Sequence, residues 1–285
     1  MKTWMITGCS SGLGRSLAYA VLRKGYQAVV TARNTDTLAD FEKEFPQTAL
    51  ILPLDVTDPA AVSQAVEAAE RFGSIDVLVN NAGYGYRAAV EEGEKEDTDR
   101  LFATNFWGPV SLMKAVLPGM RRMRSGAIVN ISSIAALGTS PGSGYYAASK
   151  CALEGLSEGL LREISPLGIK VMVVEPGAFR TDFAGRSLTQ SETCIRDYEM
   201  TAGKRRIGKD MTHGTQPGDP DKGASLIMEA VEAEHTPFRL LLGSDAVRFA
   251  DEVLEERRKE YNDWRRFSKQ SDFKSCYEIS GIYHF

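Results

Sequence analysis

A tyrosine and a lysine four residues apart are the strongest chemical signal in the sequence. Tyr146 and Lys150 lie in a run whose apolar spacing predicts a helix, and residues i and i+4 lie on one helix face. A phenol with a pKa of about 10 is a weak acid at neutral pH, and a nearby cation lowers that pKa by favouring the phenolate. Ser133 closes a strand-like run upstream and could hold a carbonyl oxygen beside the phenol. The three groups suit proton transfer at a carbonyl or alcohol oxygen, although Tyr–Lys pairs also occur by chance on solvated helices.

Alternating strand and helix patterns would position these groups. Short apolar runs predict seven strands, at residues 3–7, 27–32, 49–54, 75–79, 127–131, 170–174 and 239–242. Helical spacing is found before Gly25 and at residues 35–44, 58–72, 97–122, 144–164, 219–232 and 244–267. This alternation predicts an α/β fold, a Rossmann-like doubly wound parallel sheet of about seven strands with helices on both faces. Such sheets bind ligands at the carboxyl ends of their strands.

A glycine-rich turn follows the first predicted strand. Gly8, Gly12 and Gly14 precede a helical pattern, and this strand–turn–helix context is the one that a dinucleotide-binding turn needs. Glycines allow the backbone to approach a pyrophosphate, and the helix N-terminus favours its charge. Glycines alone are weak evidence because turns use them freely.

Composition excludes several classes of protein. The 285 residues carry a formal net charge of −4, which argues against nucleic acid as a partner. No apolar run approaches the roughly 20 residues of a membrane span. The chain enters a strand almost at once, without a signal-peptide pattern, so we expect a cytoplasmic protein. Histidines and cysteines are scattered without ligand spacing, so no metal site is predicted.

The pattern predicts one domain with an extension. Residues 1–245 would form a single dinucleotide-binding and catalytic domain, and residues 246–285 a C-terminal helical extension. Within the domain, residues 178–220 are polar and weakly periodic, which is typical of a substrate lid but also of a surface excursion without a role in binding. The charged helix of the extension has an apolar stripe that would pack on the body or on a partner subunit; a membrane-surface helix is the alternative.

Several motifs, taken together, resemble those of the short-chain dehydrogenase/reductase family in its single-domain branch, over residues 2–245. They comprise Thr7, Gly8, Gly12 and Gly14, then Asp55 and Val56, Asn80 to Gly83, Thr104 and Asn105, Ser133, Tyr146 and Lys150, and finally Pro176, Gly177 and Thr181. Their order along the chain is that of the family. The resemblance raises the Tyr–Lys pair from a coincidence to an expected active site.

The resemblance implies a role for each motif. Tyr146 would be the acid/base, Lys150 would lower its pKa and hold the nicotinamide ribose, Ser133 would polarise the carbonyl, and Asn105 would hold a relay water. The implied cofactor-binding residues are Gly8, Ser10, Ser11, Gly12, Leu13, Gly14, Arg33, Asn34, Asp55, Val56, Asn81, Ala82, Gly83, Tyr146, Lys150, Pro176, Gly177 and Thr181.

The second strand indicates the cofactor. Members of the family that use NAD usually end this strand with an acid, whereas Ala32 stands there here and Arg33 follows. A guanidinium offers charge-assisted hydrogen bonds to a 2′-phosphate. We therefore predict NADP(H), with Arg33 as the main contact, Asn34 as a helper and Arg15 adding positive potential. Arg33 as a plain surface charge, with dual specificity, is the alternative.

The substrate is less well indicated. The aromatic extension and the lid resemble those of family members that act on bulky apolar carbonyls, and the pocket residues would include Ala135, Tyr145, Phe179 and Phe183. Reduction of a ketone or aldehyde by NADPH is the predicted activity. A 3-oxoacyl or steroid/retinoid dehydrogenase and a non-catalytic NADP-binding sensor stay open as alternatives. Because the family commonly forms homo-oligomers, we expect a dimer or tetramer through the helices at 97–122 and 144–164.

Overall fold

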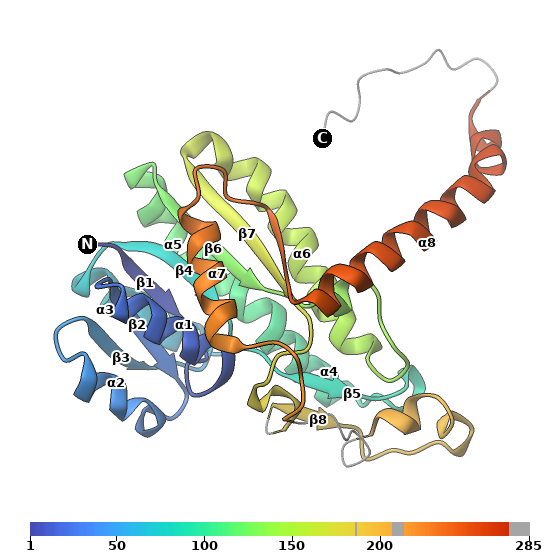
Figure 1. Cartoon of the computed structure of the whole chain (residues 1–285), viewed down its shortest axis with the longest axis horizontal. Helices are drawn as coiled ribbons and strands as arrows, with labels where there is room; N and C mark the ends of the chain where they lie inside the picture. Colours follow the sequence, from blue (N-terminus) through green and yellow to red (C-terminus); the bar gives the residue numbers. More distant parts are fainter. Residues whose placement is uncertain (186, 207–213, 274–285) are drawn as a thin grey trace.

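A parallel sheet forms the centre of the computed structural model, which describes residues 1–185, 187–206 and 214–273 (Figure 1). Within those ranges the sheet has seven strands in the order β3-β2-β1-β4-β6-β7-β9. The strands are β1 (Thr3–Ile6), β2 (Gln27–Ala32), β3 (Ala49–Pro53), β4 (Ile75–Asn80), β6 (Gly126–Ile131), β7 (Ile169–Pro176) and β9 (Arg239–Leu242). The predicted Rossmann-like fold is confirmed, because the chain order reverses beside β1 and all pairings are parallel.

Helices cover both faces of the sheet (Figure 1). One face packs against α1 (Gly12–Arg23), α2 (Ala39–Glu44) and α7 (Pro220–Glu232). The other packs against α3 (Pro59–Phe72), α5 (Gly108–Met123) and α6 (Gly144–Ile164). Successive residues of β1 point to opposite faces, so Trp4 and Ile6 enter one core and Met5 the other. Strands buried on both faces explain why the sequence shows continuous apolar runs.

The helix predicted at 97–122 is interrupted. The structure has α4 (Lys95–Phe102), a π-helical turn at Ala103–Trp107, and then α5. Pro109 lacks the N–H that would bond to the carbonyl of Asn105 in a continuous α-helix. At Gly108 a β-carbon would lie 2.7 Å from Cγ2 of Val56. The helix therefore packs closely against Val56 at the point where the π-helical turn passes into α5. The interruption places Asn105 in the widened turn.

The segment between β7 and α7 is tied to a loop about 100 residues earlier in the chain. Strand β8 (Leu188–Gln190) pairs in parallel with β5 (Gly85–Arg87), and neither strand was predicted. The buried carboxylate of Glu92 accepts hydrogen bonds from Ile195 N at 2.8 Å and from Arg206 Nη2 at 2.7 Å. The predicted lid is therefore anchored over the carboxyl edge of the sheet as far as it is described; residues 186 and 207–213 lie outside the described part.

Helix α8 (Ser244–Ser268) leaves the body of the protein and extends away from it (Figure 1). Its first turns pack on the body through Ala246 and Ala250, which are buried. From Leu254 to Phe273 every side chain is exposed. The predicted extension thus begins as a packed helix, whose last described contact with the body is the hydrogen bond from Arg257 to the carbonyl of Leu137; residues 274–285 lie outside the described range.

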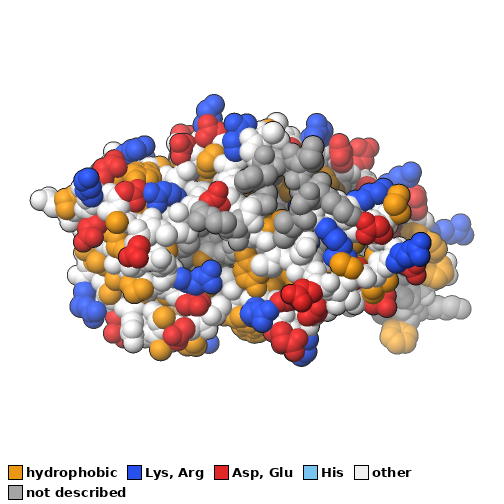
Figure 2. Space-filling model, turned by 90° about the horizontal axis from the view of Figure 1, so that it is seen from below, with side chains coloured by type: hydrophobic (Ala, Val, Ile, Leu, Met, Phe, Trp, Pro, Cys, Tyr) orange, Lys and Arg blue, Asp and Glu red, His pale blue; other side chains and the backbone are white. Residues whose placement is uncertain are grey.

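Charged side chains of both signs are interspersed on the face of the molecule that Figure 2 shows. Among the described helices, none is long and apolar enough to cross a lipid bilayer. Sheets of this topology bind their ligands at the carboxyl ends of the strands.

A buried polar network joins α6 to the sheet. Asn80 Nδ2 donates to Asn130 Oδ1 at 2.8 Å, and Asn130 Nδ2 donates to Ser157 Oγ at 2.8 Å. Ser157 Oγ donates in turn to the carbonyl of Leu153 at 2.6 Å. Asn80, Asn130 and Ser157 are at most 2% exposed. If one of these side chains is removed, its hydrogen-bond partner stays buried, and water cannot replace the lost bond.

Asn130→Ala should lower the free energy of unfolding by about 2–4 kcal/mol, because it leaves Asn80 and Ser157 buried with unsatisfied groups. Urea unfolding followed by circular dichroism would measure the change. Asn262→Ala on the exposed surface of α8 is the matched control and should change stability by less than about 0.5 kcal/mol. A loss of the same small size in both variants would contradict a stabilising role for the network.

Candidate active site

Tyr146 and Lys150 lie in the first turns of α6, beside the end of β6. Lys150 Nζ donates to the carbonyl of Ile131 at 2.8 Å and lies 5.9 Å from the centre of the Tyr146 ring. Ser133 follows β6 and caps the short turn Ile134–Ala136, with its Oγ accepting from Ala135 N at 3.1 Å. The structure therefore brings together the three groups that sequence reasoning placed in one site.

The phenol of Tyr146 stays protonated at neutral pH. Burial raises the pKa of Tyr146 to about 12, and a hydrogen bond with Ser133 offsets part of that increase. The sequence predicted the opposite direction, because it considered the Lys150 charge and not the loss of water around the phenol. The ring of Phe183 lies 5.7 Å from the Tyr146 ring, between centroids, and adds to that exclusion of water.

The ammonium of Lys150 is buried, at 5% exposure. Burial lowers the pKa of Lys150 to about 8, while the negative charge of Glu154 acts in the opposite direction. Glu154 is one helical turn beyond Lys150, so both side chains lie on one face of α6. Because the pKa of Lys150 is close to neutral pH, neighbouring groups decide whether its side chain carries a charge.

A pair of buried carboxyl groups lies behind Lys150. Ser132 Oγ donates to Glu154 Oε1 at 2.5 Å, and the carboxyl group of Glu175 is close enough to affect the pKa of Glu154. Burial and the charge of Glu154 together raise the pKa of Glu175 to about 7, against the opposing charge of Arg239, whose Nε is 3.7 Å from Glu175 Oε1. Burial also raises the pKa of Glu154.

Sequence reasoning missed this pair. The signal that could have found Glu154 is its spacing of four residues from Lys150 in a predicted helix. Glu175 gives no such signal, because it looks like any polar residue at the end of a strand. Its 1% exposure is visible only in the folded protein.

Asn105 is fully buried in the π-helical turn, and its side chain is hydrogen-bonded throughout. Oδ1 accepts from Tyr84 N at 3.1 Å, and Nδ2 donates to Tyr84 O at 2.9 Å and to Ser149 Oγ at 3.2 Å. A β-carbon on Gly83 would lie 3.1 Å from Asn105 Oδ1 and 3.5 Å from Lys150 Nζ, so both residues border the same spot. Asn105 thus fixes the loop after β4 against α6.

The glycine turn between β1 and α1 is held by Asn81. Asn81 Nδ2 donates to the carbonyls of Thr7 at 2.8 Å and Gly8 at 3.0 Å, and Ala82 N donates to Thr7 Oγ1 at 3.0 Å. A β-carbon at Gly14 would lie 2.2 Å from Asn81 Nδ2, which leaves no room for a side chain. Gly8 and Gly12 have φ of 73° and 62°, the left-handed region that favours glycine.

The start of α1 has the features of an anion-binding turn. Ser11 precedes the helix and its hydroxyl does not cap the backbone, while Ser10 is exposed. Leu13 is buried in the core, so only its backbone faces the turn. Thr181 lies over the turn, with its Cβ 3.2 Å from where a Gly12 β-carbon would be. The helix N-terminus, free hydroxyl groups and close backbone fit a pyrophosphate.

Arg33 and Asp55 follow the adjacent strands β2 and β3. Thr57 donates to Asp55 Oδ1 from its backbone N at 2.9 Å and its Oγ1 at 2.7 Å; these bonds and the charge of nearby Arg33 lower the pKa of Asp55. Arg33 is exposed, and its guanidinium has no ion pair among the described side chains. The two residues therefore border one corner of the sheet edge.

Three other predicted contacts at this edge are already engaged. Asn34 Oδ1 accepts from Asp36 N at 3.0 Å, which leaves its amide group as the available donor. Val56 is buried against Gly108 of α5. Arg15 pairs with Asp40 and also donates to Thr37 O at 3.0 Å, so its charge is largely neutralised within the protein.

The predicted substrate residues separate into two groups. Ala135 is next to Ser133, and Phe183 lies on Tyr146. Tyr145 donates its hydroxyl to Val90 O at 2.7 Å and packs on Tyr86, with ring centroids 6.1 Å apart. Phe179 packs near Gly218 and Gly223 at the start of α7. Ala135 and Phe183 border the catalytic groups, while the side chains of Tyr145 and Phe179 serve packing elsewhere.

The loop after β7 is fixed by the first turn of α8. Pro176 ends β7, and Gly177 follows it so close to Asp245 that a β-carbon there would lie 2.4 Å from Asp245 Oδ1. Asp245 Oδ2 accepts from Ala178 N at 2.7 Å. This contact sets the path of the chain towards Thr181.

Within the described residues, no three His, Cys, Asp or Glu side chains are placed to bind a metal.

Comparison with known proteins supports an oxidoreductase. A family model described as short chain dehydrogenase matches residues 2–192. Oxidoreductase BOA17 of Botryotinia fuckeliana is 38% identical over 272 residues, 95% of this chain and 99% of that protein. A 3-ketodihydrosphingosine reductase of Bacteroides thetaiotaomicron is 37% identical over 243 residues, 84% and 87% of the two chains. Retinol dehydrogenase 8 of Bos taurus is 39% identical over 257 residues, 84% and 80%.

Solved structures give the same result. A short-chain dehydrogenase from Streptomyces avermitilis has a TM-score of 0.89 and 41% identity, covering 95% of this chain and 100% of that one. An alcohol dehydrogenase from Thermococcus sibiricus, complexed with 5-hydroxy-NADP, has a TM-score of 0.69 and 27% identity over 85% and 96% of the chains. On its sequence, its sheet and the arrangement of Ser133, Tyr146 and Lys150, this oxidoreductase belongs to the short-chain dehydrogenase/reductase family.

Proposed function

We propose that this protein is an NADPH-dependent reductase of a bulky apolar ketone or aldehyde. The observation that carries the proposal is the grouping of a protonated phenol, a serine hydroxyl and a buried ammonium at the end of β6. The bound dinucleotide would supply the hydride to the carbonyl carbon. The residues of this chain would supply the proton and hold the carbonyl in place.

Tyr146 is the proton donor in this proposal. Its raised pKa of about 12 keeps the phenol protonated at neutral pH, as reduction requires. When the carbonyl oxygen gains negative charge, the proton moves from Tyr146 to it, and the Ser133 hydroxyl stabilises the same oxygen by donating a hydrogen bond. The Lys150 ammonium stabilises the phenolate left behind. Asn105 positions the loop that borders Lys150.

The turn after β1 fits a dinucleotide. A side chain at Gly14 would meet Asn81, and side chains at Gly8 or Gly12 would require an unfavourable backbone, so the surface stays flat and open to a pyrophosphate. Ser10, Ser11, Thr181 and the first N–H groups of α1 would hold the phosphates. Asp55 would contact the adenine, and Asn81, Ala82 and Gly83 would border its ribose. Tyr146, Lys150, Pro176 and Gly177 would border the nicotinamide end.

Arg33 supports NADP(H) over NAD(H). An acidic side chain at the end of β2 would repel the 2′-phosphate that would lie there. Arg33 presents an exposed guanidinium at this place instead. The related alcohol dehydrogenase was solved with a modified NADP. In a cytoplasm that keeps NADPH reduced, this preference would favour carbonyl reduction over alcohol oxidation.

An apolar substrate is supported by the surroundings of Tyr146 and by the relatives. Phe183 and Ala135 contribute apolar surface beside the catalytic groups. Two of the relatives are named for long apolar molecules, 3-ketodihydrosphingosine and retinol. The retinol dehydrogenase likeness favours oxidation of an apolar alcohol as the second candidate, with the same residues acting in reverse. A binding protein without turnover is disfavoured because Ser133, Tyr146 and Lys150 are all present and adjacent.

Tyr146→Phe should lower kcat/KM by roughly 10²–10⁴-fold, because it removes the proton donor and leaves the ring in place. NADPH oxidation on a panel of aryl ketones, steroid ketones, retinal and 3-oxoacyl esters would measure turnover, and fluorescence titration would measure NADPH binding. Tyr145→Phe is the matched control, because its hydroxyl contacts Val90 and not the catalytic groups. Wild-type turnover by the Tyr146 variant would refute the assignment.

Arg33→Ala should weaken NADPH binding by about 10- to 100-fold and leave NADH within about two-fold, because only NADPH carries the 2′-phosphate. Titration of both cofactors would give the ratio. Arg23→Ala, an exposed arginine at the far end of α1, should change neither value. Equal losses for NADPH and NADH in the Arg33 variant would reject the phosphate contact.

Glu154→Gln should move the alkaline loss of reductase activity to lower pH by about one unit. Without the Glu154 charge, the pKa of Lys150 falls below about 8, and because activity needs the ammonium, it is lost as pH rises through that pKa. Profiles of kcat from pH 6 to 9 would show the shift.

The control for this profile is Glu158→Gln, one turn further along α6, where the carboxylate is surface-exposed and pairs with Arg162 and Arg239. It should keep the wild-type profile. If Glu154→Gln lowers the rate equally at every pH, the residue has only a structural role.

A further inference from the structure

The distal part of α8, here residues 254–268, is an exposed helix with large apolar side chains. Tyr261, Trp264 and Phe267 are 69%, 60% and 65% exposed, and Leu254 is 56% exposed. Trp264 and Phe267 pack edge to face, with ring centroids 5.5 Å apart. A group of exposed aromatic side chains of this size usually marks an interaction surface. A single helix without tertiary contacts is also only marginally stable in water.

Three apolar residues of distal α8, Leu254, Tyr261 and Trp264, lie along one seam. Leu254, Arg257, Tyr261 and Trp264 are spaced by three, four and three residues, which is the spacing of helices that pair lengthwise. At 100° per residue, Leu254, Tyr261 and Trp264 lie within about 80° of one another around the helix. Such a seam needs a matching helix to cover it.

The seam continues a face of α8 that is already buried. Ala246 and Ala250 lie in the same arc of the helix and are buried against the body. Nearby, Phe249 and Val253 lie so close to Gly138 that a β-carbon there would be within 3.0 Å of either side chain. Arg257 donates to the carbonyl of Leu137. Beyond this point the body ends, and the same face has no partner among the described residues.

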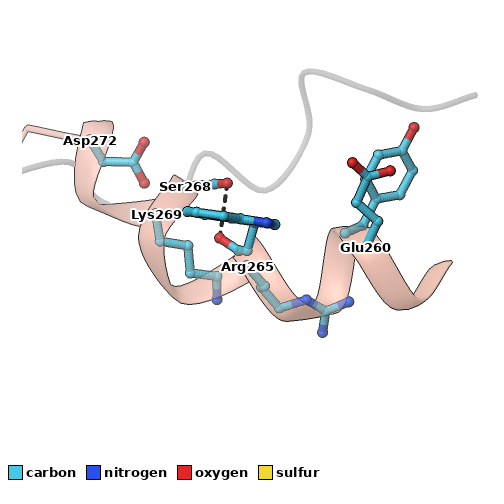
Figure 3. Close-up of a pocket in the computed structure, with 7 residues that line it drawn as sticks. Glu260, Arg265, Ser268, Lys269 and Asp272 are labelled. Carbon is cyan, nitrogen blue, oxygen red and sulfur yellow. Dashed lines mark hydrogen bonds between the residues drawn. The ribbon is translucent and has the colours of Figure 1, made fainter. Parts of the chain in front are cut away.

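Charges of opposite sign border the seam. Figure 3 shows Arg265 and Lys269 on one side of the helix and Glu260 on the other, around a shallow hollow lined also by Tyr261 and Trp264. Residues 251–269 contain six acidic and six basic side chains, so the segment has no net charge. A bilayer of acidic lipids or a nucleic acid would attract one sign and repel the other. A helix of the same sequence offers both signs in return.

We propose that distal α8 packs against distal α8 of a second copy of this chain, along the seam of Leu254, Tyr261 and Trp264. The pairing covers the aromatic side chains with their own equivalents, as a self-complementary two-fold interface requires. It differs from an interface on the helices at 97–122 and 144–164, because it lies entirely beyond the body.

Light scattering coupled to size exclusion, with the full chain at micromolar concentration, tests the proposal. Trp264→Asp should halve the mass of the wild-type oligomer and raise the dissociation constant at least ten-fold, about 1.4 kcal/mol or more. The body should remain folded, because Trp264 does not touch it; NADPH binding checks this. Trp107→Asp is the matched control, an exposed tryptophan, 59% accessible, between α4 and α5. It should leave the α8 pairing intact.

A cross-linking experiment identifies the seam directly. Tyr261→Cys should give a covalent dimer with a short bis-maleimide, whereas Lys259→Cys, on the opposite side of the helix, should give no more than the unsubstituted chain. A monomeric wild-type protein would overturn the proposal. So would an oligomer that Trp264→Asp leaves unchanged and Trp107→Asp dissociates. Binding of a monomer to phosphatidylglycerol vesicles, lost in Trp264→Asp, would instead assign the helix to a membrane surface and also overturn it.

Discussion

The buried charge of Lys150 is the constraint on which the rest of the site depends. An ammonium removed from water needs compensating groups, and here they are the Ile131 carbonyl, which accepts its hydrogen bond at the end of β6, and the nearby charge of Glu154 on α6. Both partners keep their places only if α6 stays in register with the sheet, which the Asn130–Ser157 hydrogen bond secures. A polar network in the core thus supports a charge at the edge of the sheet.

The sheet and the catalytic groups could be predicted because their signals are local. Strands buried on both faces appear as short apolar runs, and the seven predicted runs agree with the strands to within two residues at each end. Tyr146 and Lys150 are related by one helical turn, and Ser133 follows a strand that ends beside them. The carboxyl-edge rule then brings together residues that are far apart in the sequence.

The remaining features depend on contacts between distant segments. Strands β5 and β8 are separated by about 100 residues, and each is too short to show a period. The orientation of Tyr145 follows from the carbonyl of Val90, and that of Phe179 from the glycines near α7. The raised pKa of Tyr146 arises from burial, which no spacing reveals. Pro109 is the one local signal for the π-helical turn. The turn also packs against Val56, which follows β3, and this contact cannot be read from the local sequence.

The short turn that begins at Thr181 contacts both halves of the site. Thr181 lies over Gly12 in the cradle for the dinucleotide, and Phe183, two residues later, lies on Tyr146. In the proposed complex this one turn would therefore cover both the dinucleotide and the carbonyl substrate. The two half-sites of the proposed complex would then share one opening motion of this turn, which the pairing of β8 with β5 and the hydrogen bond from Ser191 Oγ to Glu92 O would resist.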